Sequence, residues 1–387
     1  MPSQHQPGLV PQVWADWHAG LIRDPVRRLR FLKSVAPQIE TAPPAAKRMP
    51  RRLLSVVLLT IAGCAFLVGE RLRVEPLPNY RRRITPPTQR ADGLPGVWLV
   101  EKTSDSETYS NGLRVNNHYR VFTHQRSYVV FPVDRPEETA GERRTQPAGI
   151  VFHTTESRQA PFAEEQTRVL KHIGESLLEY VQRRHAYNFV IDRFGRVYQV
   201  VSEGDAANHS GYSVWADTQK LYINLNESFL GVSFEAQTNP GQEEASVSPG
   251  QVRAAAMLTE MLRSRYAIAA NNCVTHAQVS VNPSNMHVGL HTDWASSFPF
   301  EQVGLPNNYA QPLAALALFG FEYDSAFEHW AGTRVFAGVE AAEELARDKA
   351  AHRGLDIREY RTLMQRLYRE KLARLGLAVS SSAEDTE

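Results

Sequence analysis

Residues 149–155 read Gly-Ile-Val-Phe-His-Thr-Thr, an apolar run that closes on a histidine and two threonines. A short apolar run rich in β-branched and aromatic residues predicts a β-strand. His153 is therefore expected at the end of a strand, where the backbone holds its side chain rigidly. The run predicts a sheet and a fixed place on that sheet for an imidazole.

The sequence on either side of this run predicts strands that alternate with helices. Apolar residues at three- and four-residue steps predict a helix over 163–184. Ser248-Pro249-Gly250-Gln251 has the pattern of a capping box with proline at the first helical position, and it predicts a helix to about Tyr266. The sequence Asp-Arg-Phe-Gly at 192–195 predicts the turn of a hairpin over 187–201.

Further strand-like runs lie at 97–100, 119–122, 128–131 and 229–237, and the chain after Pro306 is predicted to be helical. Strands interleaved with helices indicate a mixed α+β fold, in which a central mixed sheet carries helices on its faces.

The composition is that of an ordinary globular protein. The chain has 387 residues, 42% of them hydrophobic and 22% charged, with a formal net charge of +1. A charge so close to neutral gives no reason to expect a nucleic acid as partner. Two cysteines cannot form a disulfide framework, and we interpret neither Cys64 nor Cys273 as half of a bridge. The sequence shows no nucleotide or redox cofactor motif.

Residues 53–69 form an uncharged apolar segment with basic residues before it. Its length reaches the lower limit of roughly 17–25 residues that a bilayer-spanning helix needs. We interpret it as a single membrane anchor that leaves the rest of the chain exported, to the periplasm or the extracellular side. A lipoprotein signal is the second interpretation: translation would start at Met49, and Cys64 would be lipidated. A buried core helix is the third.

These patterns predict five regions. They are an N-terminal tail (1–48), the anchor or signal (49–73), a Pro- and Arg-rich linker (74–95), the globular domain (96–305) and a C-terminal helical extension (306–387). The role of the extension is open, and packing on the domain is the simplest expectation.

Two further segments carry residues of the kind that bind metal. His276 lies within 273–279, which read Cys-Val-Thr-His-Ala-Gln-Val, and Asp293 lies within 291–294, which read His-Thr-Asp-Trp. Two imidazoles and a carboxylate form a ligand set that holds Zn²⁺ and leaves a fourth position open for water, as a hydrolytic zinc requires. His287 and His291 are competing ligands in the same stretch.

The blocks occur in an order that resembles a known family. After the strand ending at His153 come 187–198 (YNFVIDRFGRVY), 207–211 (ANHSG), 230–235 (LGVSFE), Thr275-His276 and Thr292-Asp293. This order over about 145–300 is similar to that of the type-2 N-acetylmuramoyl-L-alanine amidases and the related peptidoglycan recognition proteins.

The resemblance implies a zinc hydrolase that cuts the amide between N-acetylmuramic acid and the L-alanine of the peptidoglycan stem peptide. It places the zinc ligands at His153, His276 and Asp293. It also implies substrate contacts by His209, Asn188 and Thr154, with peptidoglycan as the partner and Zn²⁺ as the cofactor.

The sequence departs from the family where proton transfer is expected. Many bacterial members carry a glutamate where this chain has Ser233, and proline follows the aspartate where this chain has Trp294. Hydrolysis needs a group that takes the proton of water and gives it to the leaving amine. Glu235, two residues after Ser233 and on the same face of a strand, is one candidate, and Tyr187 and His291 are the others.

A second function remains open. Some recognition proteins bind peptidoglycan without cutting it, and the altered Ser233, His291 and Trp294 are compatible with such a module. A zinc peptidase of another type has no support, because the chain lacks a His-Glu-x-x-His sequence. The sequence does not distinguish polymeric from fragmented substrate, and it leaves the oligomeric state open.

Overall fold

A large mixed sheet dominates the computed structural model, which describes residues 93–238 and 247–377. The sheet has eight strands in the order β1-β2-β3-β8-β7-β11-β6-β12. Their bounds are Leu99–Lys102 (β1), Ser106–Tyr109 (β2), Arg114–Asn116 (β3), Gly149–Thr154 (β6), Phe189–Ile191 (β7), Val197–Gln199 (β8), Phe229–Phe234 (β11) and Cys273–Thr275 (β12). The predicted mixed α+β fold is confirmed.

Strand β6 is the apolar run that opened the sequence, and all six of its residues are buried. It runs parallel to β11 on one side and to β12 on the other. Parallel strands covered on both faces are continuous apolar runs, which is why this segment shows no alternation of apolar and polar residues. The carboxyl ends of β6, β11 and β12 therefore meet at one edge of the sheet.

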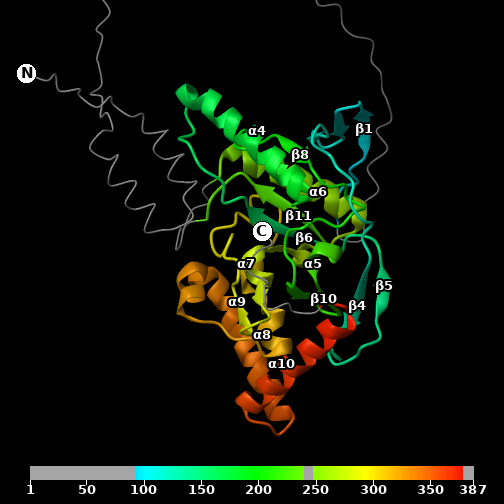
Figure 1. The fold of residues 1–387 in the computed structure, drawn as a ribbon, viewed down its shortest axis with the longest axis vertical. Helices are drawn as coiled ribbons and strands as arrows, with labels where there is room; N and C mark the ends of the chain where they lie inside the picture. Colours follow the sequence, from blue (N-terminus) through cyan, green and yellow to red (C-terminus); the bar gives the residue numbers. More distant parts are fainter. Residues whose placement is uncertain (1–92, 239–246, 378–387) are drawn as a thin grey trace, which may run out of the picture. The chain divides into compact units, whose positions relative to one another are not determined.

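Helices cover the two faces of the sheet. On one face, α4 (Thr167–Arg184) packs Leu178 and Val181 against Val190 of β7. On the other, α6 (Pro249–Tyr266) packs Leu258 into the core cluster that contains Phe152 of β6. Figure 1 shows both helices beside the central strands β6 and β11.

The start of α6 has the predicted capping box. The Ser248 hydroxyl accepts a hydrogen bond from the Gln251 amide at 3.1 Å, and the Gln251 side chain accepts one from the Ser248 amide at 3.0 Å. These two bonds satisfy backbone donors that the first helical turn leaves unpaired.

Smaller elements surround the large sheet. A second sheet has the order β5-β4-β10-β9, and β13 pairs with β14. The bounds are β4 Tyr128–Pro132, β5 Glu142–Arg144, β9 Val214–Ala216, β10 Lys220–Ile223, β13 Val281–Asn282, β14 His287–Val288, α5 Leu225–Ser228 and α7 His276–Val279, with 3-10 turns at Glu164–Gln166, Ala270–Asn272 and Asn308–Ala310.

The predicted strand over 119–122 is wrong. Only Val121 pairs there, through an isolated parallel bridge to Val201. The neighbouring Phe122 is 73% exposed, so the run lacks the buried face that stabilises a strand.

The C-terminal extension is helical, as predicted, and it packs on the domain. Its helices are α8 (Ala314–Phe319), α9 (Ser325–His352) and α10 (Ile357–Arg374). Tyr368 of α10 packs against Phe319 and donates a hydrogen bond to the Tyr212 carbonyl at 3.1 Å. Gly332, at φ 56° and ψ −165°, interrupts α9 with a conformation that only glycine adopts easily. Figure 1 shows these helices at the end of the domain away from α4.

Two sequence predictions fall outside this description. The membrane segment 53–69, with its lipoprotein alternative at Cys64, lies outside the described residues. Within 93–238 and 247–377, no helix combines the length and the apolar character that crossing a bilayer requires.

Cys273 is a buried free thiol, and burial raises its pKa to about 12.

Candidate metal centre

Two histidines meet at the carboxyl edge of adjacent parallel strands. His153 is the fifth residue of β6, and His276 begins α7 directly after β12. The register of the two strands pairs Thr275 with Phe152, so the following residues lie side by side. The two imidazole rings are 4.4 Å apart between centroids, and both side chains are buried.

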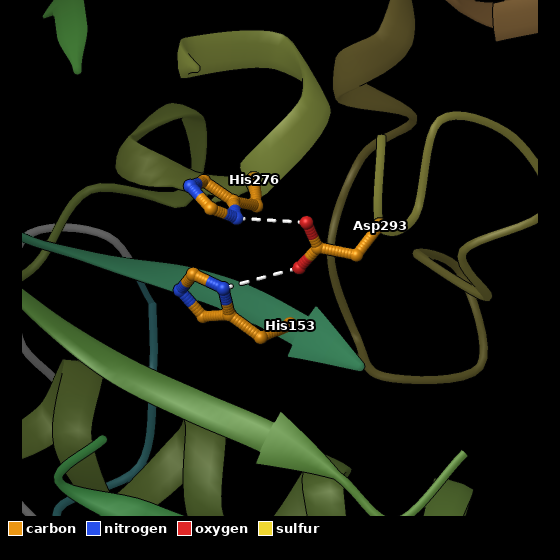
Figure 2. Close-up of side chains that lie close together, drawn as sticks. All are labelled: His153, His276 and Asp293. Atoms are coloured by element: carbon orange, nitrogen blue, oxygen red, sulfur yellow. Dashed lines mark hydrogen bonds and ion pairs between the residues drawn. The ribbon is translucent and has the colours of Figure 1, made fainter. Parts of the chain in front are cut away.

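Asp293 comes from a loop and completes the group. Its backbone carbonyl accepts a hydrogen bond from the Ala277 amide at 3.2 Å, which fixes the loop to α7. Its carboxylate lies between the imidazoles: Oδ2 is 3.1 Å from Nδ1 of His153, and Oδ1 is 2.7 Å from Nδ1 of His276. Figure 2 shows both imidazoles turning Nδ1 toward the carboxylate. Three segments that are distant in the chain thus converge on one point.

Burial and mutual charge set the protonation of this group. Burial lowers the pKa of His153 to about 4, and the neighbouring His276 acts in the same direction. Burial by itself raises the pKa of Asp293, but the charge of His276 and the close contacts with both imidazoles outweigh it, and the net pKa lies well below its usual range. An ionised Asp293 beside a neutral His153 is the protonation state that metal binding requires of these two residues.

The arrangement fits a divalent metal. One ligand atom from each of His153, His276 and Asp293 lies within 4.8 Å of the others, and all three residues are buried. Two imidazole nitrogens and one carboxylate oxygen are a donor set typical of catalytic zinc. Three protein ligands leave a fourth position for water or substrate.

Trp294 holds the aspartate loop in place. Its indole N–H donates a hydrogen bond to the His153 carbonyl at 2.9 Å, and its own carbonyl accepts one from the Tyr309 hydroxyl at 2.8 Å. Trp294 has φ 56°, in the left-handed region that a bulky residue rarely adopts. Strain of this kind persists only where surrounding contacts enforce it, and here the contacts attach the loop directly to strand β6.

A hollow of about 210 Å³ opens beside the carboxylate. Its walls are Glu156, Thr238, Leu290, His291, Thr292, Asp293 and Trp330. Leu290 is 49% exposed, and Trp330 belongs to α9 in the C-terminal extension. A larger hollow of about 370 Å³ is lined by residues such as Arg144, Lys220 and Tyr266 and includes none of the candidate site residues. We favour the smaller hollow as the candidate substrate site because of the residues that line it, and not because of its size.

Comparison with known proteins identifies the domain. Residues 143–293 match the family model of the N-acetylmuramoyl-L-alanine amidases (Amidase_2). These residues form a domain of that amidase family. The match begins just before β6 and ends at Asp293, so it includes all three candidate metal ligands. It supports peptidoglycan amidase chemistry for the domain.

Solved structures show similarity at low identity. The amidase AmiD from E. coli, in complex with anhydro-N-acetylmuramic acid-L-Ala-D-γ-Glu-L-Lys, is 17% identical, with 72% of this chain and 98% of that chain covered and a TM-score of 0.32. AmpDh3 from Pseudomonas aeruginosa, in complex with anhydromuramic pentapeptide, is 18% identical over 57% of this chain and 73% of that chain, with a TM-score of 0.31.

The peptidoglycan recognition protein SD of Drosophila is 18% identical over 35% of this chain and 73% of that chain, with a TM-score of 0.25. Similarities at this level carry no argument about activity. A comparison with curated proteins gives no match.

Two of the three proton-carrier candidates pack against the candidate metal-binding histidines of the amidase domain. The Tyr187 ring lies 5.0 Å from the His153 ring, and the Tyr187 backbone has φ 55°, a second strained residue at this site. The His291 ring stacks on His276 with centroids 4.8 Å apart and planes 15° apart. Burial lowers the pKa of His291 to about 4.

Glu235 lies in a different environment. It follows the end of β11, and its Oε2 accepts a hydrogen bond from the Arg193 amide at 3.1 Å. The same oxygen lies 3.3 Å from where a Cβ on Gly174 would be, so the carboxylate faces α4. Burial raises its pKa to about 7. Ser233, whose register partner is His153, occupies the place next to the metal-binding group, and its buried hydroxyl makes no hydrogen bond.

The residues assigned to substrate contact lie below the surface. The Asn188 side chain is fully buried and bonds backbone groups alone: its amide donates to the Ser202 carbonyl at 3.1 Å, and its oxygen accepts from the Gly231 amide at 3.0 Å. The Thr154 hydroxyl is buried and bonds Glu156 and Thr238, so it supports two walls of the hollow from behind.

His209 is 2% exposed and contacts His153 rather than lining a cleft. The sequence missed Trp330, Glu156, Thr238 and Leu290 as walls of the hollow. Glu156 could have been found from its place three residues after His153, whereas nothing in the sequence connects Trp330 with the site.

Proposed function

We propose that this amidase domain uses Zn²⁺ to hydrolyse the amide between N-acetylmuramic acid and L-alanine in peptidoglycan. The observation that carries the proposal is the convergence of His153, His276 and Asp293 within the stretch that matches the amidase family. Their Nδ1 and carboxylate atoms face one another at 2.7 and 3.1 Å.

Each residue has a role in this chemistry. His153, His276 and Asp293 would hold the ion, and the buried bonds around them fix their directions. Zinc bound there would acidify a water molecule and polarise the scissile carbonyl. The hollow beside Asp293 would receive the substrate, with Trp330 and Leu290 as its apolar walls.

A proton must also move from the water to the leaving amine. Tyr187 and His291 are the groups we propose for this step, because each packs on a metal-binding imidazole. The position and hydrogen bond of Glu235, against α4 and Arg193, support a structural role for that residue instead.

We further propose that the domain acts outside the cytoplasm on polymeric peptidoglycan or large fragments. The apolar segment 53–69 would anchor the chain in a membrane, or Cys64 would anchor it as a lipoprotein. The linker 74–95 would separate the anchor from the amidase domain, and the extension after 306 would pack on that domain.

The test is digestion of purified peptidoglycan by the full-length chain. We expect new L-alanine amino termini that disappear with a chelator and return with added Zn²⁺. Asp293→Ala should lose both activity and zinc, whereas Asp348→Ala, at an exposed position of α9, should keep both. Zinc-loaded protein that binds peptidoglycan and leaves the glycopeptide intact would contradict the proposal and indicate a recognition module. The serine at position 233 is the observation that favours this second function.

A further inference from the structure

His209 lies beneath the metal-binding group in a tightly held loop. The backbone amides of His209, Ser210 and Gly211 all donate to the Asn226 side-chain oxygen, at 2.8, 2.7 and 3.1 Å. This threefold contact sets the position of the loop independently of the imidazole. The ring is 2% exposed and lies edge-on to the His153 ring, with centroids 5.2 Å apart.

Both nitrogens of His209 have partners. Nδ1 lies 3.1 Å from Nε2 of His153, and Nε2 lies 3.3 Å from the Phe229 carbonyl oxygen. A carbonyl oxygen only accepts, so Nε2 of His209 must carry the proton in that contact. The same oxygen also accepts from Arg126 at 2.8 Å, which its two lone pairs allow.

The protons of His153 follow from this assignment. A neutral imidazole protonated on Nε2 has only a lone pair on Nδ1, so Nδ1 of His209 accepts and Nε2 of His153 donates. The proton of a neutral His153 is then on Nε2, and its Nδ1 lone pair points toward Asp293. A lone pair and a carboxylate oxygen 3.1 Å apart repel each other and require a proton or a metal ion between them. A metal ion held by both atoms meets that requirement.

We infer that His209 is a positioning residue that fixes His153 in the Nε2–H form and so directs its Nδ1 at the metal. The inference rests on the proposed zinc site and goes beyond it. Metal-binding histidines generally donate their second N–H to an acceptor that fixes the ring, and the acceptor here is a second imidazole supported by a backbone carbonyl.

Strand β11 has a glycine that makes room for this arrangement. A Cβ on Gly231 would lie 2.7 Å from Cγ of His209, closer than atoms without a bond between them approach. Gly231 pairs with Val151 of β6, so the ring of His209 packs across the backbone of β11 to reach His153. Any larger residue at position 231 would push the ring away from its partner.

The test measures zinc affinity of the full-length chain with a competing chelator. His209→Leu removes both hydrogen bonds and should weaken Zn²⁺ binding by about 10- to 100-fold. His209→Asn can keep an acceptor near His153 and should lose less. His172→Leu, the same change at an exposed position of α4, is the matched control and should bind like the unaltered chain.

Nitrogen-15 NMR of the zinc-loaded, histidine-labelled chain reads the protons directly and needs no variant. We expect His153 and His209 each to carry a proton on Nε2. A metal-bound His153 protonated on Nδ1 would overturn the inference, as would a folded His209→Leu with unchanged zinc affinity. If the unaltered chain binds no zinc, the proposed function fails at its metal site, and that result is separate from either of these.

Discussion

Replacing Glu235 with glutamine tests whether this carboxyl has a structural or a catalytic role. The folded chain raises its pKa from 4.5 to about 7 by burial. Between these two values the folded state keeps a proton that the unfolded state has lost, so the stability of the native chain falls as pH rises through this window. Each pKa unit corresponds to about 1.36 kcal/mol, so the change from pH 5 to pH 8 amounts to about 2–3 kcal/mol.

Glu235→Gln removes this titration and can keep the hydrogen bond from the Arg193 amide. The variant should therefore gain stability over the unaltered chain by about 2–3 kcal/mol between pH 5 and pH 8. Urea unfolding of chelator-treated protein at several pH values measures the difference, and other titrating groups cancel in it. Glu370→Gln, the same change at an exposed position of α10, should show no such gain.

Hydrolysis of peptidoglycan by Glu235→Gln gives the second measurement. If Glu235 is structural, kcat should stay within a few-fold of the unaltered chain. A loss of about a hundredfold or more, typical for removal of a general base, would refute our placement of Glu235 outside the proton pathway. A pH-independent stability difference would refute the assigned pKa.

Three further changes probe the site and its supports. Gly231→Ala should lower stability by about 1–3 kcal/mol and should also lower zinc affinity, because the added methyl group meets the His209 ring. Urea unfolding measures the stability and chelator competition measures the zinc affinity. Wild-type values for both would show that the ring has room. Trp330→Ala should raise the KM for a muropeptide by about tenfold, which corresponds to a loss of roughly 1.4 kcal/mol of binding free energy, and should affect kcat less. An unchanged KM would place the substrate elsewhere. Ser248→Ala should destabilise the chain by about 1 kcal/mol through loss of the α6 cap and leave zinc content unchanged.

The sequence predicts features that depend on local patterns. Strand β6 follows from its apolar run, and the start of α6 follows from the Ser248 capping box. Both patterns are contained within a few neighbouring residues, so no tertiary contact is needed to find them. The family resemblance adds to these local predictions, because the order of several sequence blocks indicates a fold that no single block specifies.

Features that depend on packing between distant segments were not predictable. Alternation along a strand places Glu235 on the face of Ser233, but it does not reveal that α4 covers that end of the face. His209 was expected at the cleft, and only the close approach across Gly231 shows that it lies beneath His153. Asn188 has the chemistry of a ligand-binding residue, yet backbone groups use its hydrogen-bonding capacity.

The packing of the C-terminal helices has a practical consequence for anyone who shortens this chain. The family match ends at Asp293, but Leu313, Phe319 and Tyr368 belong to the same hydrophobic cluster as Phe152 of β6. A fragment cut at the family boundary would expose apolar surface that these residues now cover, and such surface promotes aggregation. Expression and crystallisation of the catalytic region should therefore retain the chain through α10, and the limits of homology are not the limits of independent folding.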